Sequence, residues 1–374
     1  MTDTVFSDAF RYAHAHRDQI VWMSQNTNHL APAEVVRSAV EEALREKVYE
    51  GYPYAPGIPE LRELVLRDFN FPSDYGFLLC AGGTEALYML TRALLGPGDE
   101  VISSDPSYLI IHRFVELEGA RTVNLDIYRP PFRLTAERVA EAITPKTRMI
   151  VLIDPLNPLG SGYPPEEVRA LAELAHDHHL FLLNDVTYRD FAERHALAAA
   201  HAPSETLTVW SLSKNCGLAG MRLGGLLAPK ELCQRVAKFN TNDLGVNILA
   251  QRAGLALLRN KSSWFPAVKA QTRANQERIR AVIAGVDGVR LPVYPSQANM
   301  FVMDVSATGV SPDRLQEELL MRHGVFLRAG NYLSPTQGQK FIRASFSNPP
   351  GDIERFARAF PVAMAALRPR TPSA

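Results

Sequence analysis

The feature that most constrains the fold of this 374-residue chain is a regular alternation of short apolar runs and helix-like segments, from about residue 77 to 230. The apolar runs have the length of strands, and proline and glycine punctuate the connections between them. They lie at residues 77–80, 101–104, 149–153, 180–183, 208–212 and 223–227, with helix-like patterns at 85–95 and 164–176. This alternation predicts an α/β fold, in which a mostly parallel sheet is covered by helices on both faces.

The C-terminal part of the chain has a different pattern. Strand-like runs occur at 300–303, 325–327 and 341–346, separated by helix-like segments at 312–323 and 352–367. This order predicts a second, smaller α+β domain. The N-terminal segment is too short for a domain of its own, so we expect it to join the small domain. The expected division is a large domain at residues 45–280 and a small domain made from residues 1–44 and 281–374.

Charge and composition narrow the class of partners. The formal net charge is +0, from 40 basic and 40 acidic residues, and no basic stripe is present, so we expect no nucleic-acid partner. The N-terminus has no secretory signal pattern, and no apolar stretch reaches the roughly 18 residues that a membrane helix needs. The three cysteines are an odd number without metal-like spacing. We therefore expect reduced thiols in a cytoplasmic protein that contacts no membrane.

Lys214 is the residue with the clearest chemical meaning. It follows the apolar run at 207–210 and stands in the segment Ser-Leu-Ser-Lys-Asn-Cys-Gly-Leu-Ala-Gly-Met-Arg at 211–222. A buried lysine has a lowered pKa and can form a Schiff base with an aldehyde. Ser211, Ser213 and Arg222 are donors of the kind that hold a phosphate. An aldehyde that carries a phosphate is pyridoxal 5′-phosphate; the simpler alternative is a solvated lysine at the end of a strand.

Two further strand ends carry donors or a flat ring. At residues 80–87, a strand ends in Gly82 and Gly83, and a helix begins at Thr84. The free N–H groups of such a helix start and the Thr84 hydroxyl suit a phosphate, although a glycine pair before a helix is common. After the next strand comes Tyr108, which could stack on a heteroaromatic ring or pack as an ordinary loop tyrosine.

Two more strand ends carry an amide and a carboxylate. Prolines and a glycine fix the loop at 154–160 around Asn157, whose amide could donate to a ring oxygen or could merely belong to a turn. Asp185 follows the run at 180–183, and Tyr188 lies three residues further on. A carboxylate there can pair with a protonated pyridine nitrogen, although it could also cap a helix. All of these positions follow strands, where ligands bind in open α/β sheets.

Taken together, these motifs resemble those of fold-type I pyridoxal-phosphate enzymes of the class I/II aminotransferase family, over nearly the whole chain. The resemblance rests on Ser-x-Ser-Lys with Gly-Leu-Ala-Gly-x-Arg at 211–222, on Asn-Pro-x-Gly at 157–160, and on Asp-x-x-Tyr at 185–188. It implies a three-layer large domain with a mostly parallel sheet and a smaller α+β domain. The chain departs from the usual pattern at Val186, where the family has an acidic residue, and at Leu159, where it has threonine.

The resemblance implies a role for each of these residues in cofactor binding. Lys214 would carry the Schiff base, Asp185 would pair with the pyridine nitrogen, and Tyr108 would stack on the ring. Asn157 and Tyr188 would hold the ring oxygen, while the phosphate would be bound by Gly83, Thr84, Ser211, Ser213 and Arg222. Tyr52, in the segment at 51–62, matches a family tyrosine that reaches the phosphate of the neighbouring subunit, which implies a homodimer with shared active sites.

The substrate side is less specific. Arg343, at 341–346, matches the arginine that grips the substrate α-carboxylate. Asn26 and Arg328, with the segment at 295–301, resemble the histidinol-phosphate branch, whereas the segment at 57–62 resembles the aspartate and aromatic branch. Arg328 could bind a distal acid group of the substrate or only form an ion pair. The mixture leaves the substrate undecided.

The function expected from these residues is transfer of an amino group from an L-amino acid to a 2-oxo acid. A decarboxylase or lyase on the same scaffold is the main alternative, because the sequence does not reveal which bond at Cα is aligned for cleavage. A non-catalytic pyridoxal-phosphate-binding regulator is a remote alternative, because no basic N-terminal module is present. The histidine-rich segment at 176–179 lacks a glutamate or cysteine to complete a motif, so we expect no metal site.

Overall fold

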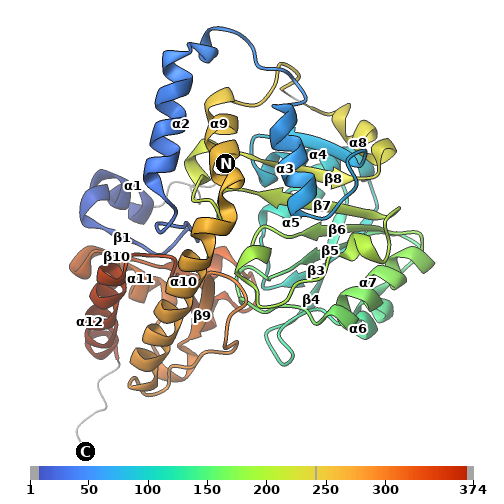
Figure 1. Cartoon of the computed structure of the whole chain (residues 1–374). Helices are drawn as coiled ribbons and strands as arrows, with labels where there is room; N and C mark the ends of the chain where they lie inside the picture. The colour runs from blue at the N-terminus through green and yellow to red at the C-terminus, as the bar shows by residue number, and fades with distance from the viewer. Residues whose placement is uncertain (1–7, 241, 369–374) are drawn as a thin grey trace, which may run out of the picture.

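The computed structural model describes residues 8–240 and 242–368, and its centre is a seven-stranded sheet (Figure 1). The strand order is β2-β8-β7-β6-β5-β3-β4. β8 is antiparallel to both of its neighbours, and every other pair in the sheet is parallel. The strands are β2 Gly76–Cys80, β3 Glu100–Asp105, β4 Arg121–Asp126, β5 Thr147–Ile153, β6 Phe181–Asp185, β7 Thr206–Ser211 and β8 Gly224–Ala228.

Helices cover this sheet and explain why its strands are apolar along their whole length. α4 packs on β7 and β8, α8 packs on β2, and α7 packs on β6. Leu182 and Leu183 are neighbours on β6, so their side chains point to opposite faces of the sheet. Both are fully buried, as expected when helices cover both faces. These helices span α4 Gly83–Leu94, α5 Ile110–Leu117, α6 Ala136–Ala142, α7 Pro165–Asp177 and α8 Lys230–Ala237.

Four further helices border the sheet and connect it to the rest of the molecule. α2 Ala33–Arg45 and α3 Pro59–Asp68 both pack on α9 Ile248–Arg259. The long α10 Lys261–Ala284 then runs toward the C-terminal part of the chain and packs on α12 (Figure 1). Pro266 is the sixth residue of this helix. A proline within the first turns of a helix removes few backbone hydrogen bonds, so the helix tolerates it.

Two small sheets form beside the large one. β11 Arg328–Ala329, β12 Phe341–Ser345 and β9 Met300–Asp304 are antiparallel, in that order. β1 Val21–Trp22 pairs in parallel with β10 Val325–Phe326, so the N-terminal segment lies against the C-terminal part of the chain. The helices on these sheets are α1 Asp8–Ala15, α11 Pro312–His323 and α12 Pro350–Leu367. Single-turn 3₁₀ helices lie at Arg17–Gln19, Val48–Glu50, Arg189–Phe191, Ala198–Ala200, Ala219–Met221, Ser306–Thr308, Gly330–Tyr332 and Gly338–Lys340.

The α/β class with a mostly parallel sheet is confirmed, and the differences from the expected elements have simple causes. β4 was missed because it is an edge strand whose residues are mostly half-buried or exposed, so it carries no apolar run. The expected strand at 325–327 ends at Phe326, and a second strand begins at Arg328, because the chain changes partner from β1 to β12 at Leu327. The division into domains at 45–280 and at 1–44 plus 281–374 remains our proposal. Within the described residues, no helix is long and apolar enough to cross a membrane.

Candidate active site

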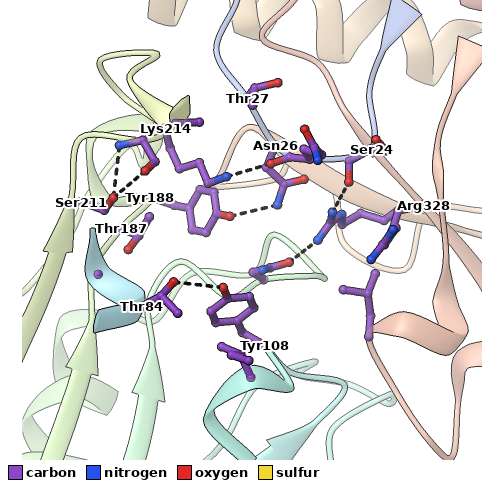
Figure 2. Close-up of a pocket in the computed structure, with 18 of the residues that line it drawn as sticks. Ser24, Asn26, Thr27, Thr84, Tyr108, Thr187, Tyr188, Ser211, Lys214 and Arg328 are labelled. Carbon is purple, nitrogen blue, oxygen red and sulfur yellow. Dashed lines mark hydrogen bonds between the residues drawn. The ribbon is translucent and has the colours of Figure 1, made fainter. Parts of the chain in front are cut away.

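A pocket of about 620 Å³ opens where the carboxyl ends of the large sheet face the small sheets, and it gathers most of the expected site residues. In Figure 2, Lys214 and Ser211 lie on one side of the pocket and Arg328 lies on the other. Tyr52 does not line the pocket, because its side chain is 81% exposed elsewhere on the surface. The expected residues that do line it are Asn26, Gly83, Thr84, Tyr108, Asn157, Asp185, Tyr188, Ser211, Ser213, Lys214, Arg222, Arg328 and Arg343.

Lys214 follows the end of β7 and points into this pocket. Its Nζ donates a hydrogen bond to the backbone oxygen of Gln25, at 2.8 Å. Burial, and after it the nearby guanidinium groups of Arg343 and Arg222, lower the pKa of Lys214 to about 7, against the opposite effect of Asp185. An amine with a pKa near neutrality can be a nucleophile and can exchange a proton, which an ordinary surface lysine does poorly.

A cluster of donors lies beside Lys214. Ser211 donates to Ser213 Oγ at 3.0 Å, and Arg222 Nη1 lies 3.4 Å from the same oxygen. Arg222 also donates to the backbone oxygens of Ala219 and Ala81, at 3.1 and 3.3 Å, so its guanidinium bridges two loops. None of these partners is a carboxylate, and the positive charge of Arg222 therefore remains available to an anion in the pocket.

The start of α4 completes this donor cluster. Gly82 has φ +89°, and a Cβ there would lie 2.5 Å from Arg222 Nη2, so only glycine lets the guanidinium pack against this turn. No side chain among the described residues caps α4, and Gly83 and Thr84, the first residues of the helix, both line the pocket. Thr84 Oγ1 lies 3.5 Å from the hydroxyl of Tyr108, and burial raises the pKa of Tyr108.

Asp185 ends β6 at the floor of the pocket. Its Oδ1 accepts hydrogen bonds from the backbone N–H of Thr187 at 3.0 Å and from the Thr187 hydroxyl at 2.7 Å. No cation forms an ion pair with this carboxylate among the described residues, and burial raises the pKa of Asp185 in spite of the Thr187 bonds. A buried carboxylate without a positive partner is costly, and a cationic group of a ligand would relieve that cost.

A second hydrogen-bonded group lies opposite the sheet. Arg343 is 5% exposed; its Nη1 donates to Asn157 Oδ1 at 2.7 Å, and its Nη2 donates to the backbone oxygen of Ser24 at 2.5 Å. Burial lowers the pKa of Arg343 to about 10. Asn26 Nδ2 donates to the hydroxyl of Tyr188 at 2.9 Å (Figure 2). The N-terminal segment thus closes the pocket over residues that follow the strands of the large sheet.

Arg328 lines the same pocket in a different environment. Its guanidinium lies over the ring of Tyr332, 3.8 Å from the centroid, and over the ring of Phe10, 4.6 Å from the centroid. No acidic side chain of the described residues pairs with it, so the ion pair that was one of the two alternatives for Arg328 does not form in the part of the chain that the structure describes. Burial lowers the pKa of Arg328 to about 10.

Several pocket groups were missed from the sequence. The backbone oxygens of Ser24 and Gln25 carry no sequence signal, because any residue could supply them. Thr187 could have been found, since a threonine two residues after an aspartate often bonds back to that carboxylate. Phe10 and Tyr332 reach the pocket only through the packing of α1 and of the turn after β11. No group of three potential metal ligands occurs among residues 8–240 and 242–368.

The comparison with known proteins identifies this architecture. The model of the family "Aminotransferase class I and II" matches residues 18–360. The chain belongs to this family. It is 32% identical over 334 residues to an aspartate/prephenate aminotransferase of Thermus thermophilus, covering 85% of this chain and 86% of the relative. It is 29% identical over 346 residues to a histidinol-phosphate aminotransferase of Methanosarcina mazei, covering 92% of this chain and 88% of the relative.

Solved structures of aminotransferases have the same fold. An aminotransferase from Mycobacterium tuberculosis superimposes with a TM-score of 0.85 at 25% identity, covering 97% of this chain and 95% of that one. A double mutant of Thermus thermophilus aspartate aminotransferase gives a TM-score of 0.82 at 28% identity, covering 96% of this chain and 97% of the other. The expected assignment to class I/II aminotransferases is therefore confirmed.

Enzymes of this family depend on pyridoxal 5′-phosphate, and the pocket fits that cofactor. Lys214 provides an amine with a lowered pKa, and Asp185 provides a buried carboxylate that forms no ion pair among the described residues. The uncapped start of α4, together with Ser211, Ser213 and Arg222, provides donors for a phosphate within the same pocket. The part assigned to each residue remains a prediction.

Proposed function

We propose that this aminotransferase moves the amino group of an L-amino acid to a 2-oxo acid, with Lys214 as the group that exchanges protons with the substrate. The observation that carries the proposal is the position of Lys214 in the pocket, with a pKa of about 7 and with phosphate-binding donors on one side and Arg343 on the other. The relatives named above differ in their substrates, so they support transamination and leave the amino donor open.

When bound, pyridoxal phosphate withdraws electrons from the Cα of an attached amino acid and so makes its proton acidic. In the proposed mechanism, the Nζ of Lys214 accepts this Cα proton and later returns it. A group that acts first as base and then as acid works best with a pKa near the working pH. The lowered pKa of Lys214 meets this condition, because burial disfavours the ammonium form.

We propose that the sheet-edge residues hold the cofactor. Asp185 would face the ring nitrogen, and Asn157 and Tyr188 would donate to the ring oxygen. Because Asn157 Oδ1 already accepts from Arg343, the amide Nδ2 is the group that remains to donate into the pocket. Tyr108 would stack on the ring, and the phosphate would lie among Gly83, Thr84, Ser211, Ser213 and Arg222.

We propose that Arg343 binds the α-carboxylate of the substrate. Its guanidinium is buried and bonded only to neutral oxygens, of Asn157 and Ser24, which a carboxylate can displace or join. Asn26 is held against Tyr188 beside it, where its amide can contact the same part of the substrate. Its backbone has φ 53°, a conformation that asparagine tolerates better than most residues.

We propose that two copies of the chain form a homodimer, in which Tyr52 reaches the phosphate of the neighbouring subunit. Tyr52 is 81% exposed and Tyr54 is 68% exposed, and Leu44, Tyr49 and Leu244 are exposed as well. Exposed aromatic and aliphatic side chains in such number are typical of surfaces that contact a partner. Light scattering should give twice the mass of the chain, and Tyr52→Ser should weaken cofactor binding.

We also propose a cytoplasmic location, which the three buried, unpaired cysteines support.

The test is a product assay on the purified protein loaded with pyridoxal phosphate. A panel of amino acids is offered with a 2-oxo acid acceptor, and both the new 2-oxo acid and the new amino acid are quantified. Equal amounts of the two products would support transamination, whereas release of carbon dioxide without a new amino acid would show a decarboxylase instead. Lys214→Ala should be inactive, and Lys230→Ala, at an exposed lysine that pairs with Asp74, should be unaffected.

A further inference from the structure

The residue that follows Lys214 is held both by its side chain and by its backbone. Asn215 is buried, and it is not among the described residues that line the pocket. Its Oδ1 accepts a hydrogen bond from the backbone N–H of Cys216 at 2.8 Å, and its Nδ2 donates to the carboxylate of Asp190. Its backbone oxygen accepts from Asn28 Nδ2 at 2.7 Å. Asn215 therefore fixes the backbone next to Lys214.

Asp190 is a rigid partner for Asn215 because two cations hold its carboxylate. The side chain of Asp190 is 11% exposed, with Lys261 Nζ at 2.8 Å and Arg189 Nε at 3.7 Å. Burial acts to raise the pKa of Asp190, but Arg189 and Lys261 outweigh it and hold the pKa below its ordinary value. Both cations also pair with Asp68, so two positive and two negative charges balance. These four residues form the anchor cluster.

The anchor cluster connects three parts of the large domain. Asp68 ends α3, Lys261 begins α10, and Arg189 and Asp190 belong to the 3₁₀ turn after β6. Asn215 lies after β7, so its bond to Asp190 attaches the loop that carries Lys214 to this junction. The charges of the cluster already balance without Asn215. The bond is therefore not needed to neutralise the cluster, and its effect falls on the loop.

The segment that covers the pocket is held at the same point. Lys214 Nζ donates to the backbone oxygen of Gln25 at 2.8 Å (Figure 2), and Asn28, three residues after Gln25, donates to Asn215. Gly217 packs closely on this segment, since a Cβ there would lie 2.7 Å from the backbone oxygen of Asn28. The donor and the acceptor of the Lys214 hydrogen bond thus both lie within three residues of the contact between Asn28 and Asn215. A shift of Asn215 should move both.

We propose that Asp190 is a positioning residue, which acts through Asn215 to hold the amine of Lys214 where it exchanges protons with the substrate. Neither Asp190 nor Asn215 lines the pocket among the described residues, so both act through Lys214 and not on the substrate. The inference rests on the proposed function, because it takes Lys214 as the proton-exchanging group. Proton transfer depends on such alignment, since a displacement of about 1 Å can cost about 100-fold in rate.

The reactivity of Lys214 in the cofactor-free chain tests the position of its amine without turnover. Competitive acetylation with acetic anhydride over a range of pH, read by mass spectrometry, gives the pH at which a lysine becomes reactive, with the exposed Lys230 as reference. We expect a midpoint of about 7 for Lys214. Asn215→Ala changes no charge but frees the amine toward solvent, so the midpoint should rise by about one pH unit or more. An unchanged midpoint would overturn the proposal.

The sign of the change in Asp190→Ala separates position from charge. Loss of a nearby carboxylate would by its charge alone lower the pKa of an ammonium group, whereas loss of position should raise the midpoint of Lys214. Asp68→Asn is the matched control, because it removes a carboxylate of the anchor cluster that pairs with Arg189 and Lys261, and it should leave the midpoint unchanged. A lowered or unchanged midpoint in Asp190→Ala, or an equal rise in Asp68→Asn, would contradict a positioning role.

An exchanged pair tests the hydrogen bond itself in the cofactor-loaded enzyme. Asn215→Asp places two carboxylates against each other, so kcat should fall about 10- to 100-fold while KM stays within about two-fold. Addition of Asp190→Asn restores one donor and one acceptor and keeps an oxygen for the N–H of Cys216, so kcat should return to within about three-fold of the wild-type value. A folded double variant no better than Asn215→Asp would refute the role of this bond. If Asn215→Asp does not fold, the acetylation of Asn215→Ala decides.

The outcomes also separate this inference from the proposed function. A raised Lys214 midpoint in Asn215→Ala and Asp190→Ala, in a protein that transfers no amino group, would contradict the proposed function and support the positioning of Lys214. Amino-group transfer at the wild-type kcat in both variants, with unchanged midpoints, would support the proposed function and overturn the role of Asp190.

Discussion

The two walls of the pocket differ in the charges that they carry and in the partners of those charges. The sheet-edge wall (Asp185, Ser211, Ser213, Lys214 and Arg222) mixes both charges with hydroxyl donors, and its members bond to one another or to nearby loops. The arginine wall (Ser24, Asn26, Arg328 and Arg343) places two like charges in register, and among the described residues their partners are neutral oxygens and aromatic rings. The first wall is therefore suited to hold one ligand permanently, and the second to bind and release anions.

This contrast implies that substitutions in the two walls should change different kinetic constants. Residues of the sheet-edge wall should affect the chemical step, and thus kcat. Residues of the arginine wall should affect substrate binding, and thus KM, because we propose that Arg343 binds the substrate α-carboxylate and takes no part in proton transfer at Cα. The following predictions test that separation, from the largest expected effect to the smallest.

Replacement of Lys214 should have the largest effect. Lys214→Ala removes the amine that exchanges the Cα proton, so we expect kcat to fall about 10⁴-fold or more, because general acid–base catalysis alone contributes up to this factor. Pyridoxal phosphate should still bind through the phosphate donors, which equilibrium dialysis can measure. A variant that neither folds nor binds the cofactor would not show whether Lys214 acts on kcat. Turnover by Lys214→Ala at a wild-type rate would refute the mechanism.

Replacement of Arg343 should act mainly on KM. Arg343→Gln leaves the substrate α-carboxylate without its guanidinium, so kcat/KM should fall about 100-fold for acidic and neutral amino acids alike. Cofactor affinity should not change. Steady-state kinetics and dialysis would measure both quantities. Arg278→Gln is a suitable control, since Arg278 forms an exposed ion pair with Glu354 that contributes little. A fall in kcat with unchanged KM would contradict the division into two walls.

The lowered pKa of Lys214 should appear in the stability of the cofactor-free protein. Its pKa is about 7 in the folded protein and 10.5 ordinarily, so the unfolded chain binds more protons between these values. Stability should therefore rise with pH in that window, and Lys214→Met should be most stabilising below pH 7. The gain should shrink by about 1–3 kcal/mol between pH 7 and pH 9. Urea unfolding of both proteins measures it; a constant difference would contradict the lowered pKa.

The smallest effect is expected at Thr187. Thr187→Val removes the hydroxyl that donates to Asp185 at 2.7 Å but keeps the shape of the side chain. The carboxylate should lose one hydrogen bond of about 1 kcal/mol, so kcat should fall about five-fold with little change in KM. Thr187→Ser keeps the hydroxyl and should behave like the wild type. A change confined to KM would assign Thr187 to substrate binding instead.

The sheet-edge wall was accessible from the sequence because each of its residues follows a strand. A parallel sheet brings the carboxyl ends of its strands to one edge, so local motifs such as those of Lys214 and Asp185 predicted a shared pocket. The order of the strands and the antiparallel direction of β8 were not readable in the same way, because they depend on pairing between distant segments.

The arginine wall depends on such distant pairing, and its chemistry was correspondingly undecided. Nothing near Arg328 in the sequence shows that it lies opposite Arg343, or that α1 brings Phe10 over its guanidinium. The sequence therefore could not show whether Arg328 forms an ion pair, and the structure contains no carboxylate partner for it within the described residues. The backbone oxygens of Ser24 and Gln25 were also inaccessible, since they depend on chain path rather than on residue type.

The most direct test of the account is the visible absorbance of the cofactor-loaded protein through one half-reaction. We predict a band from the cofactor bound to Lys214, which an amino acid bleaches and a 2-oxo acid restores. Lys214→Ala should lack the band, and Arg343→Gln should keep it but need higher amino-acid concentrations for bleaching. A protein that binds pyridoxal phosphate but shows no reversible bleaching with any amino acid would contradict the central claim.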